Sequence, residues 1–359
     1  MVRTAVIGLG RAAAEIHLPA CRMLPEIEVV AGCDPDEARR MALARQFGLP
    51  AVYADPVEML AREQPELVIV GVPPAHHSRM AQLALEHGAH VLCEKPFVGS
   101  LDEADCLIET AMQQRRLLAV NNQYRYMDIY RQTKAKLLEG VYGPLFYVQA
   151  WQQMFHPPSV EQTLWRRALP RYTLFEFGTH PLDLICHFFD ALPLAVNAIA
   201  SPARAGDGAD VLVQMTLYFP DERYAVLSLN RVSHAPERYL EMRLDCERAS
   251  LRLSYGGVAR AGLSLNRTQD GYRPDLRFSL VKGGEARAES GGRSARIAAA
   301  RRPPLAQATA RHLIALLPEM QQPQPSLARA RWAREILRIV FAGYESAARR
   351  QVVMLAPDA

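Results

Sequence analysis

The stretch Val6-Ile7-Gly8-Leu9-Gly10-Arg11-Ala12-Ala13 decides the fold, because a G-x-G-x-x-A turn joins an apolar strand to a helix. In this pattern the first glycine permits a tight turn, and the second lets the backbone approach a pyrophosphate. The small third position allows close packing, and the helix N-terminus supplies N–H donors and a positive dipole end. We therefore predict a phosphate cradle made of Gly8, Gly10, Arg11, Ala12 and Ala13.

A carboxylate closes the next predicted strand. Residues 29–33 are apolar or small, and Asp34 follows them directly. A carboxylate at this point can accept hydrogen bonds from the adenosine ribose hydroxyls and repel a 2′-phosphate. The pattern therefore favours NAD over NADP. A second role, compatible with the first, is that Asp34 caps the helix predicted over 36–47.

Apolar runs alternate with helical spacing over the first 122 residues. The runs are continuous, as in a parallel sheet that is buried on both faces. We predict strands over 2–7, 29–33, 52–53, 67–72, 90–93 and 117–120, and helices from the glycine turn to residue 24 and over 36–47, 56–63, 76–87 and 101–115. This order predicts an α/β fold that begins with a doubly wound Rossmann sheet, an NAD(P)-binding domain over 1–122.

The pattern changes after residue 122, where longer segments alternate between apolar and polar residues. β-like segments cover 145–153, 194–200, 210–219, 223–231, 238–246 and 248–254, and helices are predicted over 128–139, 173–190, 306–317 and 326–349. We predict a substrate-binding α/β domain over 123–359 with a large, mostly antiparallel open sheet covered on one face. A last strand over 352–355 and the helix before it are expected to pack back toward the first domain. Residues 282–304, rich in Gly, Ala, Arg and Ser, are predicted to form an exposed loop.

The composition narrows the class of protein. A chain of 359 residues exceeds what one core usually holds, so two domains are expected. The formal charge of +4 is small and scattered, which argues against a nucleic-acid partner. No apolar stretch reaches the roughly 18 residues of a membrane span, and the N-terminal strand leaves no room for a signal peptide. Six cysteines without metal-ligand spacing are expected to be buried reduced thiols, so we predict a cytoplasmic protein without a metal.

Glu94-Lys95-Pro96 follows the strand predicted over 90–93. Open α/β sheets bind ligands at the carboxyl ends of their strands, so this amine is expected beside a nicotinamide ring. Lysine occurs only at positions 95, 134, 136 and 282, in a chain whose other fixed cations are arginines. The use of lysine at position 95 therefore suggests that this position requires a compact, titratable amine. Positive charge on the ring would lower the pKa of Lys95, which could then hydrogen-bond a substrate hydroxyl or relay its proton.

A second group of polar residues lies in the helix predicted over 173–190. Glu176 and His180 are four residues apart and share one face of a helix. Histidine is the usual proton acceptor near neutral pH, and the carboxylate could orient its ring or bind substrate. Asp183, three residues further on, could hold the other ring nitrogen. The alternative for His180 is a structural histidine.

One weaker candidate follows the strand predicted over 67–72. His77 comes after Pro73-Pro74 and either lines the edge of the cofactor or lies on the surface of the first helical turn. His156 and His187 are interpreted as structural.

Taken together, these residues resemble the glucose-fructose oxidoreductase / inositol dehydrogenase (Gfo/Idh/MocA) family over nearly the whole chain. The resemblance rests on the glycine turn, Cys93-Glu94-Lys95-Pro96, Gln123-Tyr124-Arg125-Tyr126, Tyr142-Gly143-Pro144-Leu145, Trp165-Arg166, Gly178-x-His180-x-x-Asp183 and Tyr344-Glu345-Ser346-Ala347. It implies that Lys95 and His180 are the catalytic pair, with His180 as acid/base. It also implies that Glu94 and Lys95 lie against the nicotinamide and that Trp165 and Arg166 lie near the cofactor or the substrate. We further expect Pro73, His77 and Gln123 near the cofactor, and Arg125 near the substrate.

Two departures from the family pattern affect the substrate pocket. Glu176 stands where the family usually has aspartate, and its longer arm could change which hydroxyl is held. Residues 168–173 replace a glycine-rich stretch and place Arg171 and Tyr172 at the predicted pocket mouth. Arg171 suggests an anionic or phosphorylated substrate group.

The first functional hypothesis is an NAD-dependent oxidoreductase that interconverts a secondary alcohol and a ketone on a sugar, cyclitol or related polyol. A second hypothesis keeps the same site but uses transient oxidation to permit elimination, as in a redox-neutral glycosidase or lyase. A third is a non-catalytic, cofactor-gated binding protein, because a fold does not fix a function. The family resemblance implies a homodimer or homotetramer formed through the C-terminal sheet.

Overall fold

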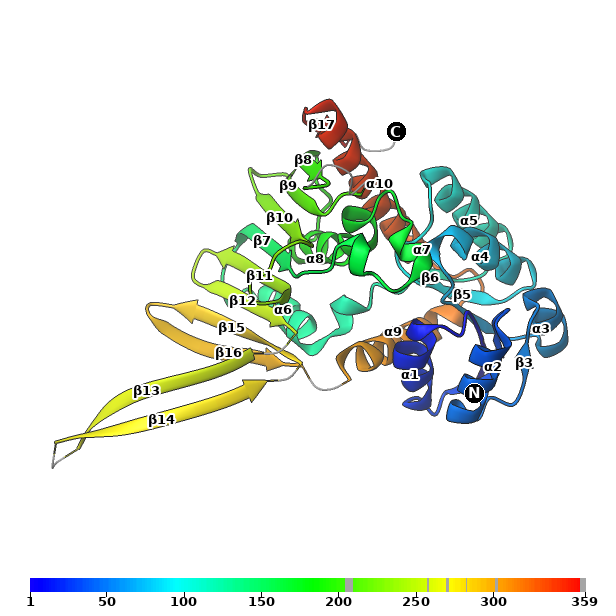
Figure 1. The fold of residues 1–359 in the computed structure, drawn as a ribbon, viewed down its shortest axis with the longest axis horizontal. Coiled ribbons are helices and arrows are strands. Elements are labelled where there is room, and N and C mark those ends of the chain that lie inside the picture. Colours follow the sequence, from blue (N-terminus) through cyan, green and yellow to red (C-terminus); the bar gives the residue numbers. More distant parts are fainter. Residues whose placement is uncertain (204–208, 257, 269–270, 282, 301–302, 356–359) are drawn as a thin grey trace.

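Six short strands form a parallel sheet in the spatial order β3-β2-β1-β4-β5-β6 (Figure 1). The computed structural model describes residues 1–203, 209–256, 258–268, 271–281, 283–300 and 303–355. The strands are β1 (Val2–Ile7), β2 (Ile27–Cys33), β3 (Val52–Tyr53), β4 (Leu67–Val70), β5 (His90–Cys93) and β6 (Leu118–Val120). All four residues of β4 are fully buried, which explains its continuous apolar run. The winding direction reverses between β1 and β4, so the loops after these strands border a crevice.

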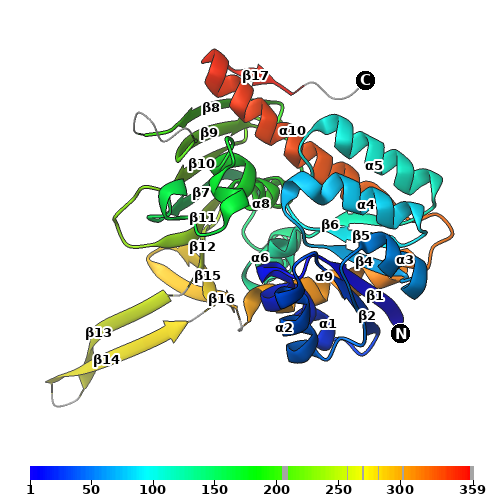
Figure 2. The same ribbon diagram turned by 45° about the vertical axis from the view of Figure 1, so that its right-hand side comes forward.

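Helices cover both faces of this sheet (Figure 2). They are η1 (Ala13–His17, a π-helical turn), α1 (Leu18–Arg22), α2 (Glu37–Phe47), α3 (Pro56–Glu63), η2 (Pro74–His76, a 3₁₀ turn), α4 (His77–Glu86) and α5 (Leu101–Gln113). Helix α2 is capped by Asp36, which accepts a hydrogen bond from the backbone N–H of Arg39. The predicted capping role of Asp34 is therefore wrong, because the helix begins at Glu37 and the cap is the residue before it.

The second sheet has nine strands in the order β16-β15-β12-β11-β7-β10-β9-β8-β17. They are β7 (Leu145–Gln153), β8 (Ala195–Ser201), β9 (Leu212–Tyr218), β10 (Tyr224–Asn230), β11 (Arg238–Cys246), β12 (Ser250–Tyr255), β15 (Gly284–Ser290), β16 (Arg293–Ala299) and β17 (Val353–Met354). Only the β7–β10 pair is parallel, so the sheet is mixed and mostly antiparallel, as predicted.

Shorter helices lie between the two sheets and beside the second one. They are η3 (Gln123–Tyr126), α6 (Asp128–Leu138), η4 (Pro158–Val160), α7 (Leu164–Arg167), η5 (Thr173–Phe177) and α8 (Thr179–Phe189). The helix predicted over 173–190 is thus divided into the π-helical turn η5 and α8. The carboxylate of Asp210 accepts hydrogen bonds from the backbone N–H groups of Tyr172 and Leu174, which satisfies the first donors of η5.

The loop predicted over 282–304 is wrong. Strands β15 and β16 occupy most of it as an antiparallel pair, and residues 282 and 301–302 lie outside the described residues. The inward positions carry alanine, with Ala286 fully buried and Ala298 nearly so. Helix α6 packs closely against both strands, so a methyl group fills the space that a larger side chain usually would. The absence of large apolar residues hid the alternation.

Two helices from the end of the chain connect the domains. Helix α9 (Pro304–Met320) contributes Leu313, Leu316 and Met320 to a core cluster with β1 and β4. Helix α10 (Ala328–Arg349) contacts α5 and β6 of the first domain and α8 and β8 of the second (Figure 2). Strands β13 (Val258–Thr268) and β14 (Gly271–Val281) pair only with each other and project away from the nine-stranded sheet in both views (Figure 1).

The helices and the cysteines bear on two predictions made from the composition. Among the helices that the structure describes, none combines the length and apolar character required to cross a bilayer. All six cysteines are unpaired, and five are buried as expected, whereas Cys106 is exposed on α5.

Candidate active site

The glycine turn leaves room for a ligand. Gly8 has φ +95°, and a Cβ there would lie 2.7 Å from the carbonyl carbon of Gly71, so only glycine fits this approach of β1 to β4. A Cβ at Gly10 would meet no heavy atom within 4 Å. Gly10 therefore borders open space beside the start of a helix, as a cradle for a pyrophosphate requires.

The predicted carboxylate braces this turn. Asp34 is 5 % exposed and accepts hydrogen bonds from the backbone N–H groups of Leu9 and Asp36, both at 2.9 Å. Ala13 is fully buried, which agrees with a close contact between helix and strand. Arg11 is exposed and pairs with Glu15 at 2.9 Å. Pro73 precedes the 3₁₀ turn η2 at the edge of the crevice.

Glu94, at the carboxyl end of β5, contacts both η1 and the residue that follows β6. Its Oε1 lies 3.0 Å from Nε2 of His17 and accepts a 2.8 Å hydrogen bond from Asn121. Although burial alone would raise the pKa of Glu94, the contacts with His17 and Asn121 and the charge of Lys95 lower it to about 2. The carboxylate is therefore ionised, and it fixes the backbone from which Lys95 extends.

Lys95 reaches from the first domain to the second. The Lys95–Pro96 peptide bond is cis. The Lys95 Nζ donates to the backbone carbonyl oxygen of Glu176 at 3.0 Å and to the side-chain Oε1 of Glu176 at 3.2 Å. An ammonium group has three donors, so one N–H of Lys95 remains for a substrate oxygen.

Glu176 is shared between two cations. Arg166 donates from Nε to the Glu176 Oε1 at 3.2 Å, and its Nη1 lies 3.5 Å from Oε2 of Glu161. The Arg166 guanidinium also packs over the ring of Trp165 at 4.8 Å. Glu176 is 2 % exposed, whereas the side chains of Lys95 and Arg166 are partly exposed, so the network lies at the edge of the buried interior. The predicted residues Lys95, Arg166 and Glu176 thus meet at one point.

His180 lies on the first turn of α8, against the ring of Tyr124. The two rings are stacked, with centroids 3.8 Å apart and planes 7° apart. Burial, reinforced by the nearby charge of Lys95, lowers the pKa of His180 to about 3. The imidazole is therefore neutral near pH 7 and can accept a proton. Tyr124 had not been predicted as a site residue, and the sequence carried no signal for the stacking.

The predicted role of Asp183 is wrong. Its carboxylate accepts a hydrogen bond from Nε of Arg125 at 2.6 Å and another from Nε1 of Trp332 at 2.9 Å. Nδ1 of His180 is buried and has no hydrogen-bond partner within the described residues. The spacing along a helix predicts that Asp183 lies near His180. In the structure, Arg125 of η3 and Trp332 of α10 donate to the Asp183 carboxylate instead. Arg125 is thereby committed to an ion pair.

Three further predicted residues do not face the Lys95–Glu176 contact. The Arg171 guanidinium lies over the rings of Phe341 and Tyr344 on α10, at 5.3 and 5.4 Å. Tyr172 is fully buried and donates its hydroxyl to the carbonyl of His156. His77 is buried, not on the surface of its turn, and both ring nitrogens lie near backbone carbonyls of residues 72, 96 and 97.

Gln123, 2 % exposed, has a buried Oε1 without a hydrogen-bond partner within the described residues.

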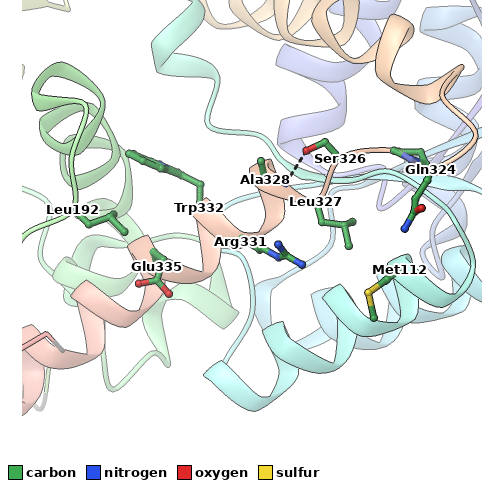
Figure 3. A pocket seen from close by; sticks show the side chains of 10 residues that line it. Met112, Leu192, Gln324, Ser326, Leu327, Ala328, Arg331, Trp332 and Glu335 are labelled. Carbon is green, nitrogen blue, oxygen red and sulfur yellow. Dashed lines mark hydrogen bonds between the residues drawn. The ribbon is translucent and has the colours of Figure 1, made fainter. Parts of the chain in front are cut away.

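An open cavity of about 470 Å³ lies elsewhere, between α5 and α10 (Figure 3). Its walls include Met112, Leu192 and Trp332, and none of the predicted site residues lines it. Trp332, one of its lining residues, donates a hydrogen bond to Asp183. Within the described residues, no group of three or more His, Cys, Asp or Glu side chains could hold a metal ion.

These features define the class of protein: its first domain is a dinucleotide-binding Rossmann fold. The family model described as "Oxidoreductase family, NAD-binding Rossmann fold" matches residues 2–122, and the "GFO/IDH/MocA C-terminal domain" model matches residues 130–252. The chain therefore belongs to the Gfo/Idh/MocA family, and its first domain has the NAD-binding fold.

The chain matches individual relatives over only about half to two thirds of their length, at moderate sequence identity. The chain is 32 % identical to D-glucoside 3-dehydrogenase of Escherichia coli over 56 % of its own length and 55 % of the relative. It is 26 % identical to 2,7-anhydro-N-acetylneuraminate hydratase of Mediterraneibacter gnavus over 66 % of its own length and 63 % of the relative. A solved oxidoreductase from Agrobacterium radiobacter, in complex with NAD+, L-tartaric acid and magnesium, shares the fold at a TM-score of 0.80 and 17 % identity, with 98 % of each chain covered.

Proposed function

We propose that the protein is an NAD-dependent dehydrogenase that interconverts a secondary alcohol and a ketone on a sugar, cyclitol or related polyol. The observation that carries the proposal is the contact of Lys95, at the carboxyl edge of the Rossmann sheet, with Glu176. Glu176 lies four residues before His180, and the nearby charge of Lys95 acts on that neutral imidazole, so both groups belong to the proposed site. The glucoside dehydrogenase among the relatives agrees with this substrate class.

In the proposed reaction, His180 accepts the proton of the substrate hydroxyl while the carbinol hydrogen leaves as a hydride. The low pKa of His180 keeps the imidazole neutral, and stacking on Tyr124 restricts the orientation of the ring. Lys95 donates its remaining N–H to the developing alkoxide, and Glu176 fixes the direction of that donor. Bound nicotinamide supplies the hydride acceptor, and it is held by the glycine turn, Asp34, Glu94 and Gln123 in this proposal.

A screen of polyols, sugars and sugar acids with NAD, followed by nicotinamide absorbance, tests the proposal. Formation of NADH with at least one substrate supports it. Absence of turnover across the panel, together with tight binding of one compound only when NAD is present, would favour the cofactor-gated binding protein instead.

A second candidate function is a redox-neutral hydration or elimination that uses transient oxidation. The observation that favours it is the similarity to a hydratase over 66 % of the chain. Oxidation of a carbinol to a ketone acidifies the C–H on the adjacent carbon. The base removes that proton, and the leaving group departs from the next carbon as the double bond forms; in the hydration direction, water adds to that double bond instead. Return of the hydride would then reduce the ketone to the original carbinol. Turnover without net NADH, accompanied by solvent deuterium incorporation, would identify this reaction.

The choice of NAD over NADP is expected to depend on Asp34. Replacement of Asp34 by serine should lower the preference for NAD over NADP by at least about tenfold, because the carboxylate that repels the 2′-phosphate is lost. Arg40, whose guanidinium donates to the backbone carbonyls of residues 34 and 35 at 2.7 and 2.9 Å, keeps these contacts in the variant and leaves a cation close to the position of that phosphate. The measurement is the ratio of dissociation constants for the two dinucleotides.

The matched control is Asp36→Ser, which keeps an N-cap on α2 and removes a neighbouring carboxylate. Its ratio of dissociation constants should equal that of the wild-type protein. An unchanged ratio in Asp34→Ser would reject the role of Asp34 in choosing the cofactor, whereas a loss of both dinucleotides alone would report only a loosened turn.

We also propose, in line with the family resemblance, a cytoplasmic homodimer or homotetramer formed through the outer face of the nine-stranded sheet. This face carries Ile199, Tyr218 and Tyr224, which are 69, 41 and 46 % exposed. Tyr147 and Tyr224 contact each other across the parallel β7–β10 pair, with ring centroids 5.0 Å apart. Exposed apolar patches of this kind mark protein interfaces.

The double variant Ile199→Asp, Tyr224→Asp should therefore be monomeric at concentrations where the wild-type protein is a dimer or larger, because burying two carboxylates in an apolar interface is unfavourable. Analytical ultracentrifugation measures the change. Leu138→Asp, an exposed apolar position on α6, is the control and should keep the wild-type mass. If the double variant has the same molecular mass in solution as the wild-type protein, the interface lies elsewhere.

A further inference from the structure

Arg231 is a buried cation at the end of an apolar row. The inward positions of β10, Ala225, Leu227 and Leu229, are at most 1 % exposed, and Arg231 continues their alternation just after the strand. Arg231 is itself 2 % exposed. A charged side chain on the covered face of a sheet is costly to bury unless it is paired.

The guanidinium has no ion-pair partner in the part of the chain that the structure describes. Nη2 donates to Oε1 of Gln152 at 3.3 Å, Nη1 contacts Sδ of Met154, and Nε has no partner. The guanidinium lies over the ring of Phe177, with Cζ 3.5 Å from the centroid. Burial lowers the pKa of Arg231 to about 10, so it remains protonated at neutral pH. A full positive charge is therefore held with only neutral neighbours in contact.

This charge lies beside the proposed active site. Phe177, on which the guanidinium rests, follows Glu176, the residue that holds Lys95. The charge of Arg231 also acts on Glu176 and on Tyr124, whose ring carries His180. Arg231 therefore lies near Glu176 and Tyr124, two residues of the proposed active site.

Resting on the proposed dehydrogenase function, we propose that Arg231 binds a carboxylate of the substrate, which makes the substrate an acidic sugar or polyol. The unpartnered Nε–H and an Nη2 N–H form one edge of the guanidinium, and two parallel N–H donors match the two oxygens of a carboxylate. Arg231 is thus a specificity-determining residue.

The other charges of the site support a carboxylate rather than a phosphate. Lys95 is already paired with Glu176, and Arg166 is shared between Glu176 and Glu161. Of these three cations, Arg231 is the one without an ion-pair partner within the described residues, and a single guanidinium matches a monoanion better than a dianion. The sequence had suggested an anionic substrate group through Arg171, but that guanidinium lies over α10. The structure assigns the same chemistry to a different arginine.

The test compares matched substrates with wild-type protein and the variants Arg231→Met and Arg231→Lys. The pairs are glucuronate with glucose, galacturonate with galactose, and gluconate with sorbitol, and glucose 6-phosphate is added as a dianion. Activity is measured as kcat/KM for NADH formation. Binding of each acid to protein without cofactor is measured separately by its effect on Tm and by calorimetry.

We expect the wild-type protein to prefer at least one acid over its neutral partner, and Arg231→Met to lower kcat/KM for that acid by about 10- to 100-fold. The neutral partner should change little, and Arg231→Lys should retain part of the preference. Because Arg231→Met removes an unpaired buried charge, its Tm should be equal to or higher than that of the wild-type protein. A purely structural arginine would lower Tm and affect both partners alike.

Arg223→Met is the matched control, since its guanidinium also packs over a phenylalanine ring, that of Phe189, but just before the other end of β10. It should leave the acid preference unchanged. Equal turnover of acid and neutral partners by the wild-type protein, an equal loss for both in Arg231→Met, or a preference for glucose 6-phosphate would overturn the proposal.

Failure of the dehydrogenase proposal has a different signature. If no compound of any pair is oxidised, the binding arm decides about Arg231 alone. An acid that raises the Tm of the wild-type protein but not of Arg231→Met then supports the carboxylate site, and no difference between the two proteins rejects it.

Discussion

Replacement of Lys95 by alanine or methionine is expected to lower kcat by about a thousandfold, the loss typical of a proton-relay or oxyanion-stabilising group. Within the described residues, the one predicted cofactor-binding residue that forms a hydrogen bond with Lys95 is Glu94, whose side chain accepts from the Lys95 backbone N–H. The amine itself points to Glu176. NAD affinity should therefore stay within a factor of about three, because the interaction that is removed is made with the substrate in the transition state.

Single-turnover kinetics and calorimetric titration with NAD separate the two effects. Lys134→Met is the matched control, because Lys134 is also half-buried but lies on α6, near the Phe188 carbonyl and Asp190. Its kcat should equal that of the wild-type protein. Full activity in Lys95→Met would remove Lys95 from the mechanism, and a parallel loss of NAD binding would assign it to the cofactor instead.

Replacement of His180 by asparagine should lower kcat by about a hundredfold to ten-thousandfold, the range for loss of a general base. The low pKa of the imidazole gives a second expectation. Burial lowers the pKa of His180 to about 3, so its acceptor form is present throughout the range from pH 5 to pH 8. The profile of kcat/KM for oxidation in wild-type protein should therefore show no step from His180 in that range.

The same shift makes stability depend on pH. The unfolded chain binds a proton at His180 near pH 6.5, whereas the folded protein does so only near pH 3. The unfolded state then binds more protons between these values, so the contribution of His180 to stability is full above pH 6.5 and is lost as the pH falls toward 3. The Tm of His180→Asn should decrease less on acidification than that of the wild-type protein.

Thermal unfolding at a series of pH values measures this difference. His87→Asn is the control, since His87 is exposed and its Nδ1 lies 2.9 Å from the Leu83 carbonyl. A step in kcat/KM near pH 6.5 that disappears in His180→Asn would show that His180 titrates normally in the working enzyme. Retained turnover in His180→Asn would exclude it as the base.

The relation between sequence and fold differs between the two domains. In the Rossmann domain, the strands are continuous apolar runs that need no partner to be recognised, because both faces of the sheet are covered. In the second domain, β15 and β16 escaped prediction, because their buried positions are alanines that pack against α6. The size of the side chain that fills a site is set by the distance to the neighbouring element, which no local pattern contains.

The candidate site shows the same division. The strand-end position of Lys95 and the helical spacing of Glu176 and His180 follow from local geometry, and the structure brings Lys95 and Glu176 into contact. The partner of Asp183 does not follow from local geometry, since Arg125 and Trp332 come from η3 and α10. Spacing along a helix tells which residues share a face, but not what faces them.

The sequence by itself determined the doubly wound first domain, the glycine turn and the identity of the groups that can do chemistry, because each depends on short-range geometry. Only the tertiary structure decided which charges remain without a partner. Arg171 packs on α10, whereas Arg231 is left buried without a counter-ion within the described residues. Compensation of charge depends on side chains that lie far apart in the chain, and folding alone brings them together.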